Sequence, residues 1–267
     1  MIYLDKLTEE KVLRMLINSG NRSIGNGSSR IVYVCPLEVI EYLEKKFAGH
    51  IYFNPTVDYI VKVGIGFAGF NQIELERNTF ETYSDTYDIF AEIPCCGKMV
   101  EIMEKVLIPC AQCVDYWGPE EFFCEVNDFN YAWYNDAFFE KNGTPLYNID
   151  EIETIAVENG YSIDYSVDFC EGAFDVQYEL DNILGETSDN GQIGMNSYGN
   201  AVVYDFGFDP NRDRETYVSY SSDEISWAED KYLEFLVDYL ENRISYDNYT
   251  NGDVSDLVDD FMVEMEN

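Results

Sequence analysis

The chain has 267 residues, 46% of them apolar, which is enough to bury a hydrophobic core and excludes a disordered acidic tail. It carries 52 acidic residues against 16 basic ones, a formal net charge of −36. Such a charge repels DNA, RNA and anionic lipid, so we expect no direct nucleic-acid binding and no membrane association. No apolar run approaches the roughly 18 residues that a membrane-spanning helix needs.

The negative charge is concentrated in one part of the sequence. Between Val106 and Asn211 there are 21 acidic residues and one basic residue, Lys141. A surface of this kind attracts basic surfaces of other proteins. Solubility or adaptation to high salt would also explain it, and the composition alone leaves these alternatives open.

Cysteine usage and the start of the chain both bear on the compartment. The seven cysteines are an odd number, which fits a reducing cytoplasm better than a disulfide framework. The first residues are amphipathic and acidic, unlike a signal peptide. We therefore expect a cytoplasmic protein.

Apolar periodicity predicts the elements of the first hundred residues. In chain order these are a helix over 8–19, strands over 31–34 and 59–63, a helix over 71–83, and short strands over 89–94 and 99–103. Residues 37–47 fit either a helix or a hairpin.

The remainder of the chain is predicted to be mostly helical. Residues 115–185 are rich in aromatic and acidic residues, and we expect helices and loops there. A strand is predicted over 200–204, and amphipathic helices are predicted over 227–243 and from 253 onward. Strands before residue 106 and helices after it indicate an α+β fold of two lobes, 1–107 and 108–267.

Three short motifs carry chemistry. Gly25 and Gly27 precede a β-branched strand, where a tight turn can present backbone amides to phosphates. Lys62 lies within an apolar strand, where a charged side chain is costly unless it has a partner. Asp205 ends an apolar strand in the sequence Asp-Phe-Gly, a usual position for a metal ligand.

In this order the motifs resemble those of protein kinases. The segment around Gly25 and Gly27 is similar to the glycine-rich loop, with Arg30 in place of the third glycine and Val32 in the strand that follows. Lys62 resembles the lysine that binds the α- and β-phosphates of ATP.

The resemblance extends to the helix and strands that follow this lysine. Glu74 matches the helix glutamate that pairs with the lysine, with Glu76 and Glu81 as alternatives. Residues 100–106 are similar to the strand that leads to the adenine-binding hinge. The resemblance makes Met103 the gatekeeper and directs the backbone from Glu104 to Val106 toward adenine.

The same resemblance implies the fold and the cofactors. The fold would be a protein-kinase-like two-lobed α+β fold, with a small antiparallel-sheet N-lobe and a mostly helical acidic C-lobe. ATP and Mg would be bound, with Asp205 as a metal ligand. Compact, divergent kinase-like proteins encoded by bacteriophages are the relatives that the chain resembles, which would place it in the host cytoplasm.

The catalytic loop departs from the kinase pattern. Counting back from Asp205 by the kinase spacing gives Gln192 where a metal-binding asparagine is expected, and no His-Arg-Asp precedes it. Asp189 or Glu186 would have to act as the base, and Asn190 as a metal ligand, on a re-routed loop. Loss of these groups would reduce phosphoryl transfer by orders of magnitude.

Two functions follow as hypotheses. The first is a kinase-like nucleotide-binding protein, a pseudokinase or weak phosphotransferase that acts on or binds a host protein. The second is a non-enzymatic acidic inhibitor that mimics nucleic acid and blocks a basic groove of a host or defence enzyme.

Overall fold

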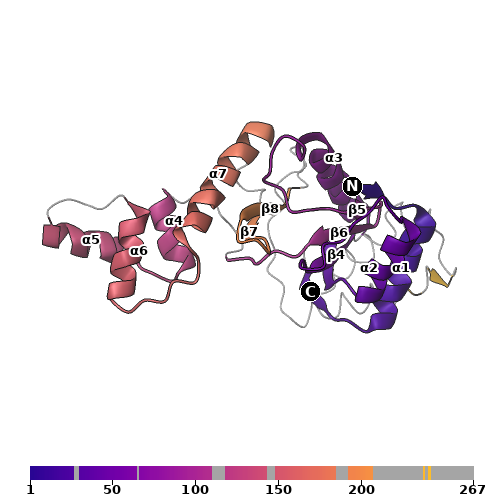
Figure 1. Cartoon of the computed structure of the whole chain (residues 1–267), viewed down its shortest axis with the longest axis horizontal. Helices are drawn as coiled ribbons and strands as arrows, with labels where there is room; N and C mark the ends of the chain where they lie inside the picture. Colours follow the sequence, from indigo (N-terminus) through magenta and orange to yellow (C-terminus); the bar gives the residue numbers. More distant parts are fainter. Residues whose placement is uncertain are drawn as a thin grey trace, which may run out of the picture. The chain divides into compact units, whose positions relative to one another are not determined.

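The computed structural model describes residues 1–26, 30–64, 66–109, 118–142, 148–184, 192–206, 237, 240 and 241 (Figure 1). Within these ranges the protein is α+β, with seven helices, a six-stranded sheet and a separate two-stranded sheet. The chain forms two compact units. Unit 1 comprises Met1–Tyr83, Glu92–Lys105 and Gly207–Asn267, and unit 2 comprises Ser84–Ala91 and Val106–Phe206. The division into lobes 1–107 and 108–267 stays a prediction.

Unit 1 is built on the six-stranded sheet. Its strands are β1 (Ile2–Tyr3), β2 (Ser23–Asn26), β3 (Arg30–Val34), β4 (Tyr59–Gly64), β5 (Cys95–Cys96) and β6 (Val100–Glu104), in the spatial order β1-β5-β6-β4-β3-β2. All neighbours are antiparallel except β1 and β5, which are parallel. The sheet is therefore mixed rather than purely antiparallel, because the short β1 adds to its edge.

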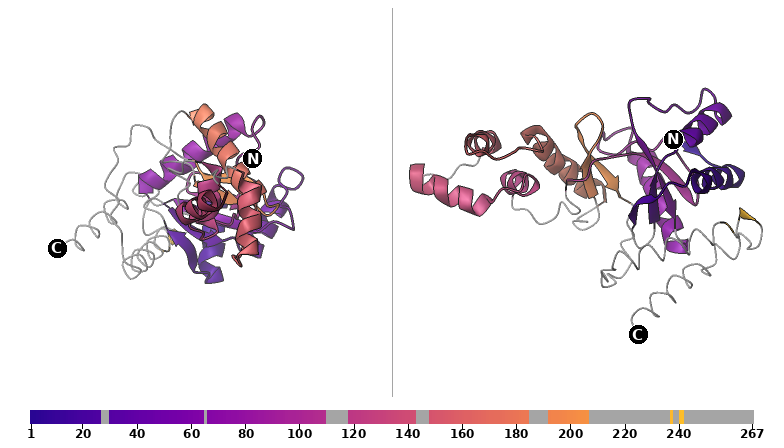
Figure 2. Two further views of the ribbon diagram at one scale, coloured as in Figure 1. Left: turned by 90° about the vertical axis from the view of Figure 1, so that its left-hand side faces the viewer. Right: turned by 90° about the horizontal axis from the view of Figure 1, so that it is seen from below.

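Side-chain alternation gives the two faces of this sheet different partners. One face joins the core of unit 1 through β3, β4 and β6: Ile31, Tyr33, Tyr59, Val61, Val63, Val100 and Ile102. Helices α1 (Lys6–Ser19) and α2 (Leu37–Lys46) supply Val12, Leu13, Leu16, Val39 and Leu43 to the same core. The two helices lie next to each other in Figure 1 and in the right-hand view of Figure 2. The intervening residues of the strands face the other side, where α3 (Gly66–Tyr83) contributes side chains.

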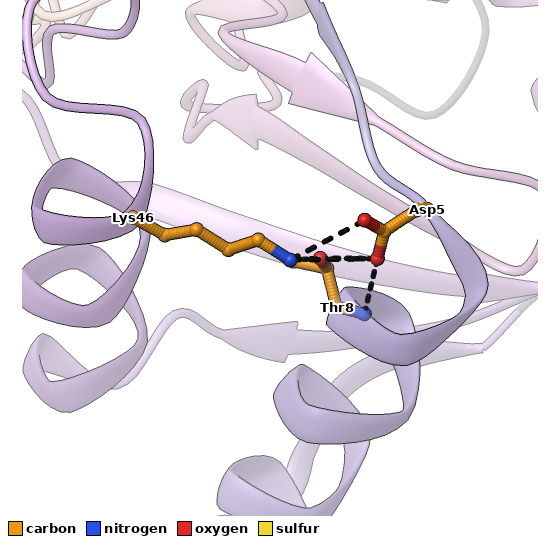
Figure 3. Close-up of polar contacts among 3 residues, drawn as sticks. All are labelled: Asp5, Thr8 and Lys46. Carbon is orange, nitrogen blue, oxygen red and sulfur yellow. Dashed lines mark hydrogen bonds and ion pairs between the residues drawn. The ribbon is translucent and has the colours of Figure 1, made fainter.

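A polar contact links the two helices at the surface. Asp5 is the N-cap of α1, and its Oδ1 accepts hydrogen bonds from the Thr8 backbone nitrogen at 2.8 Å and the Thr8 hydroxyl at 2.6 Å (Figure 3). Lys46, in the last turn of α2, lies 3.4 Å from Asp5 and also contacts the Thr8 hydroxyl. The hydrogen bonds from Thr8, and to a lesser degree the Lys46 charge, lower the pKa of Asp5.

Glu9 ties α1 to the turn between β5 and β6. Its side chain is buried, and Oε1 accepts hydrogen bonds from the backbone nitrogens of Met99 at 2.6 Å and Val100 at 3.0 Å. A Cβ at Gly97 would come within 2.2 Å of this carboxyl, so only glycine leaves room for it. Burial raises the pKa of Glu9 to about 7, although these backbone donors oppose the shift.

Residues near the end of the chain contribute to unit 1. Leu240 is buried in the core with α1 and α2, and the Arg14 guanidinium donates a hydrogen bond to its carbonyl oxygen. The Glu241 backbone nitrogen donates to the Val237 carbonyl oxygen at 2.8 Å, an i to i−4 bond. The rest of the predicted helices over 227–243 and after 253 lies outside the described residues.

The described residues of unit 2 form four helices and a hairpin. Its helices are α4 (Pro119–Val126), α5 (Tyr131–Asn142), α6 (Ile149–Glu158) and α7 (Val167–Leu184), and its strands are β7 (Gln192–Met195) and β8 (Ala201–Asp205). Figure 1 shows α4 beside α6 and α7. Unit 2 thus has its own core, with Phe122, Phe123, Ile152, Phe169 and Leu180 among its buried residues.

One buried asparagine holds the end of α4 to the segment before α7. The Asn127 amide donates to the carbonyl oxygens of Phe123 at 2.9 Å and Tyr165 at 3.0 Å. Its Oδ1 accepts from the backbone nitrogens of Asp164 at 2.7 Å and Tyr165 at 2.8 Å. These four bonds join the C-terminal end of α4 to the backbone of Asp164 and Tyr165, shortly before α7.

We expect Asn127→Leu to destabilise unit 2 by about 2 kcal/mol, because partly buried backbone groups lose their hydrogen bonds to the buried Asn127 side chain. The matched control is Asn159→Leu. Asn159 is exposed, and its amide donates only to the Ile155 carbonyl oxygen. Urea denaturation followed by circular dichroism measures both variants. Equal losses of stability at the two positions would contradict the prediction.

Several element predictions are confirmed and others corrected. The strands predicted over 31–34, 59–63, 99–103 and 200–204 correspond to β3, β4, β6 and β8, and 37–47 is the helix α2 rather than a hairpin. The strand predicted over 89–94 is wrong: the strand there is β5, which begins at Cys95. Phe90 instead forms an isolated bridge with Val203, and the Ala91 backbone nitrogen donates to the Val203 carbonyl oxygen.

Candidate functional site

A cluster of four charged side chains lies buried within unit 1. It contains Arg30 of β3, Lys62 of β4, Glu76 of α3 and Glu101 of β6, none of them more than 5% exposed. Lys62 Nζ lies 3.0 Å from Glu76 Oε2 and 3.1 Å from Glu101 Oε1, and Arg30 Nη1 lies 2.5 Å from Glu76 Oε2. Two cations and two carboxyl groups therefore share one enclosed site.

The strand register brings three members of this cluster together. Lys62 is the direct cross-strand partner of Glu101 on one side and of Val32 on the other. Arg30 lies two positions before Val32, and side chains two apart in a strand lie on the same face. Lys62, Glu101 and Arg30 therefore project from the face that does not join the apolar core under α1 and α2.

The helix partner of Lys62 is Glu76, not Glu74, which the sequence resemblance placed there first. Two positions along an α-helix correspond to about 200°, so Glu74 and Glu76 point in nearly opposite directions. Glu76 is fully buried, whereas the side chain of Glu74 is 61% exposed and pairs with Arg77 at 3.5 Å. The pairing of the lysine with Glu74 was therefore wrong, and the alternative residue Glu76 takes that position.

The pKa values of the two carboxyl groups in the cluster are shifted in opposite directions. Burial alone would raise the pKa of Glu76, but the charges of Arg30 and Lys62 outweigh it and lower that pKa. The pKa of Glu101 is raised, first by burial and then by the neighbouring Glu76 carboxylate. Glu76 is thus the ionised member of the pair, and a protonated Glu101 can donate a hydrogen bond toward it.

The other nucleotide-binding residues predicted in the N-terminal part are spread over several elements. Gly25 lies in β2, Val32 is half-buried in β3, and Gly27 lies outside the described residues. Met103 and Glu104 are both buried at the end of β6, and the Glu104 backbone nitrogen donates to the Glu92 carbonyl oxygen at 2.8 Å. Val106 is buried and belongs to unit 2.

The predicted metal-binding residues centre on the β7–β8 hairpin of unit 2. Asp205 is the last residue of β8 and the cross-strand partner of Gln192, the first residue of β7. Phe206 is buried against Phe90, with ring centroids 4.9 Å apart. Gly207, Asn190, Asp189 and Glu186 lie outside the described residues, the last three in the segment that connects α7 to β7.

The donor types at these positions suit the cofactors that the resemblance implies. A carboxylate and an amide oxygen at the end of one hairpin are hard ligands of the kind that Mg²⁺ accepts together with substrate phosphates. Within the described ranges no group of three or more His, Cys, Asp or Glu residues is placed to hold a metal ion by itself. Lys62 has the charge for a phosphate, but its ammonium is almost fully enclosed. Lys62 lies in unit 1 and Asp205 in unit 2, so a cleft that both residues line stays a prediction.

Unit 2 also has a cavity of about 440 Å³ with an acidic lining. Its lining includes the acidic residues Asp88, Asp168, Asp175 and Glu179, together with the apolar residues Ile89 and Val176. Unit 2 as a whole contains 22 acidic residues and one basic residue, Lys141. The charge concentration seen in the sequence therefore coincides with one compact unit.

Glu101 was missed by the sequence reasoning. The sequence does contain an indication of its role. Glu101 lies within the apolar strand Val100–Glu104, where a buried charge is costly without a partner, as it is for Lys62 in β4. The two residues are partners of each other across the strands.

Comparisons of the chain with protein-family models, with curated proteins and with solved structures find no match. In the described part of the chain, none of the helices combines the length and apolar character needed to cross a bilayer. Each unit is therefore described by its own geometry. Unit 1 has a buried lysine that pairs with a helix glutamate and a strand glutamate, and unit 2 has a hairpin that ends in an aspartate.

Proposed function

We propose that this chain is a protein-kinase-like nucleotide-binding protein, a pseudokinase or weak phosphotransferase of phage origin that acts on or binds a host protein. The observation that carries this proposal is the ion pair between Lys62 of β4 and Glu76 of α3, the helix that follows β4 directly. A lysine on a central strand fixed by a glutamate on the next helix is the arrangement that a kinase uses to bind ATP phosphates.

The order of elements in unit 2 supports the same proposal. Helix α7 is followed by residues 185–191 and then by a hairpin that ends at Asp205. A kinase has its catalytic loop and metal-binding aspartate in this order. If a nucleotide and Mg²⁺ bind as proposed, Lys62 would neutralise phosphate charge, and Asp205 and Gln192 would hold the metal ion. The metal ion would screen the charge of the nucleotide phosphates.

Binding is favoured over fast phosphoryl transfer. Residues 185–191 contain neither His-Arg-Asp nor any lysine or arginine. Positioning and charge neutralisation supply most of the catalysis of phosphoryl transfer, so a loop without these groups should transfer slowly. Asp189 and Glu186 are the acids of this segment that could accept a proton from a hydroxyl substrate.

Thermal unfolding with and without Mg-ATP tests the nucleotide proposal. A ligand that binds only the native state at 100 times its Kd stabilises that state by about 2.7 kcal/mol, so we expect a clear rise in Tm. Asp205→Asn should reduce the magnesium-dependent part of the rise. Asp150→Asn, on the exposed N-terminal turn of α6, is the matched control and should leave it unchanged. No shift at millimolar Mg-ATP in the parent protein or either variant would overturn the proposal.

The charge of unit 2 favours a second candidate function, binding to a basic groove of a host or defence enzyme in place of nucleic acid. Its support is the 22 acids against one lysine in this unit, together with the acid-lined cavity. Such binding should weaken steeply as salt increases and should compete with DNA or RNA for the same partner. A partner complex insensitive to both salt and nucleic acid would contradict this function.

A further inference from the structure

Two exposed aromatic side chains of unit 2 pack against one buried ring. Phe129, which follows α4, is 4% exposed, and its ring centroid lies 4.5 Å from that of Tyr161 and 6.2 Å from that of Trp133. Trp133 and Tyr161 are themselves 52% and 39% exposed. These three residues form what we call the aromatic patch, which presents parts of two large rings to solvent.

The backbone holds both exposed rings in place. At the end of α6, Gly160 takes the left-handed conformation with a φ of 86°, and the Tyr161 backbone nitrogen donates to the Ala156 carbonyl oxygen at 3.0 Å. Trp133 lies in the first turn of α5, where its backbone nitrogen donates to Asn130 Oδ1 at 2.9 Å. Aromatic side chains on a fixed backbone lose little conformational entropy when they bind, which suits them to a protein interface.

Exposed carboxyl groups lie on the same helices as these rings. Asp136 is three positions after Trp133 on α5, so the two residues share one face of the helix. Glu158 is the last residue of α6, three positions before Tyr161. Residues 118–184 contain 16 acidic residues and one basic residue. The aromatic patch therefore lies in a strongly negative part of the chain.

We infer that the aromatic patch is the contact surface for a basic segment of a partner protein, with arginine side chains of that segment stacked on Trp133 and Tyr161. The inference rests on the second candidate function and deepens it, because it names residues that contact the basic partner. The face of an aromatic ring attracts a cation. A guanidinium group is planar and weakly hydrated, so it stacks on such a face better than an ammonium group does.

The negative charge makes other occupants of the aromatic patch less suitable. Exposed aromatic rings can also stack on nucleic-acid bases or lie at a lipid surface. Nucleic-acid phosphates and anionic lipid would be repelled by the acidic residues, and a second copy of this chain would bring the same acids against each other. A basic protein segment is the occupant that both the rings and the charge attract.

Trp133→Leu tests the inference, because leucine keeps the position apolar but has no aromatic face. Binding of oligoarginine and oligolysine peptides of equal length to the full chain is measured by fluorescence anisotropy. We expect the parent protein to prefer oligoarginine, and the variant to lose about threefold of this preference, the contribution of one exposed cation–π contact. The matched control is Tyr178→Leu, which should keep the preference, since Tyr178 of α7 is 69% exposed and outside the aromatic patch.

A measurement on the parent protein does not depend on how well a variant folds. In hydroxyl-radical footprinting, bound oligoarginine should protect Trp133 and Tyr161 from oxidation more than it protects Tyr178. Equal protection of the three residues, or a preference for oligoarginine that Trp133→Leu leaves unchanged, overturns the inference. A dimer of the parent protein that Trp133→Leu dissociates, seen by analytical ultracentrifugation, would identify a second copy as the occupant and would also overturn it.

The second candidate function can fail separately from this inference. If Trp133→Leu removes the preference for oligoarginine but partner complexes are insensitive to salt and to nucleic acid, the function fails and the inference stands. If DNA or RNA competes for the partner and Trp133→Leu leaves the affinity for that partner unchanged, the function stands and the inference fails.

Discussion

Glu76→Gln is expected to lower the free energy of unfolding of unit 1 by about 3–5 kcal/mol, because it removes the charge of a buried carboxylate that pairs with both Arg30 and Lys62. Both cations are nearly inaccessible to water. Both cations would lose a buried carboxylate that neutralises them, and the raised pKa of the neighbouring Glu101 favours its uncharged form. A loss of this size is a large fraction of the stability of a typical domain.

Glu74→Gln is the matched control for this change. The two residues belong to the same helix and undergo the same substitution, but Glu74 is exposed and its pairing with Arg77 is a surface contact. Surface ion pairs contribute about 0–1 kcal/mol, so Glu74→Gln should have little effect. Guanidinium chloride denaturation followed by circular dichroism measures both variants. Similar losses at the two positions would show that the buried cluster does not stabilise unit 1.

The stability of the protein is expected to be greatest near pH 5 and to decline toward pH 8. The pKa of Glu9 in the folded state is about 7, above its ordinary value of 4.5. The folded chain therefore retains a proton that the unfolded chain releases, and the stabilisation, complete below pH 4.5, is lost as pH rises through about 7. A shift of this size corresponds to about 3 kcal/mol, and Glu101, whose pKa is also raised, adds to the decline.

The acid side of this profile has the opposite cause. The pKa values of Asp5 and Glu76 are lowered in the folded state, so their contributions are present above the ordinary carboxyl pKa and are lost as pH falls below it. Free energies of unfolding between pH 4 and 8 measure both the acid side and the decline above pH 5.

In Glu9→Gln the side-chain oxygen still accepts hydrogen bonds from the backbone nitrogens of Met99 and Val100. The side chain no longer ionises, so the decline in stability from pH 5 to 8 should become smaller. An unchanged decline in this variant would contradict the role of Glu9.

Much of the sheet of unit 1 could be predicted from the sequence, because β3 and β4 are β-branched runs of ordinary strand length. The edge strand β1 could not be predicted. It has two residues, and it exists because its backbone pairs with Cys95 and Cys96, far along the chain. Residues 37–47 fitted two structures because so short an amphipathic segment leaves the period ambiguous, and packing against α1 favours the helix α2.

The candidate site shows the same limit. Lys62 can be identified from the sequence alone, because it is a charged residue inside an apolar strand. Its partners depend on the strand register and on which face of the helix points inward, and the sequence alone specifies neither. The kinase spacing pointed to Glu74, but a two-residue difference along the helix determines which carboxyl is buried. The strand predicted over 89–94 failed because Phe90 and Ala91 are buried by packing and bridging to β8, not by belonging to a strand.

The buried charge cluster also bears on how the protein folds. Its members come from β3, β4, α3 and β6, so Arg30 and Glu101 can meet only after strands far apart in the chain have paired. Ion pairs that are shielded from water add stability only once both partners are held in place. We therefore expect these contacts to form after the rate-limiting step of folding. A cluster that forms this late governs how slowly the native state opens rather than how quickly it assembles, and so sets the lifetime of unit 1.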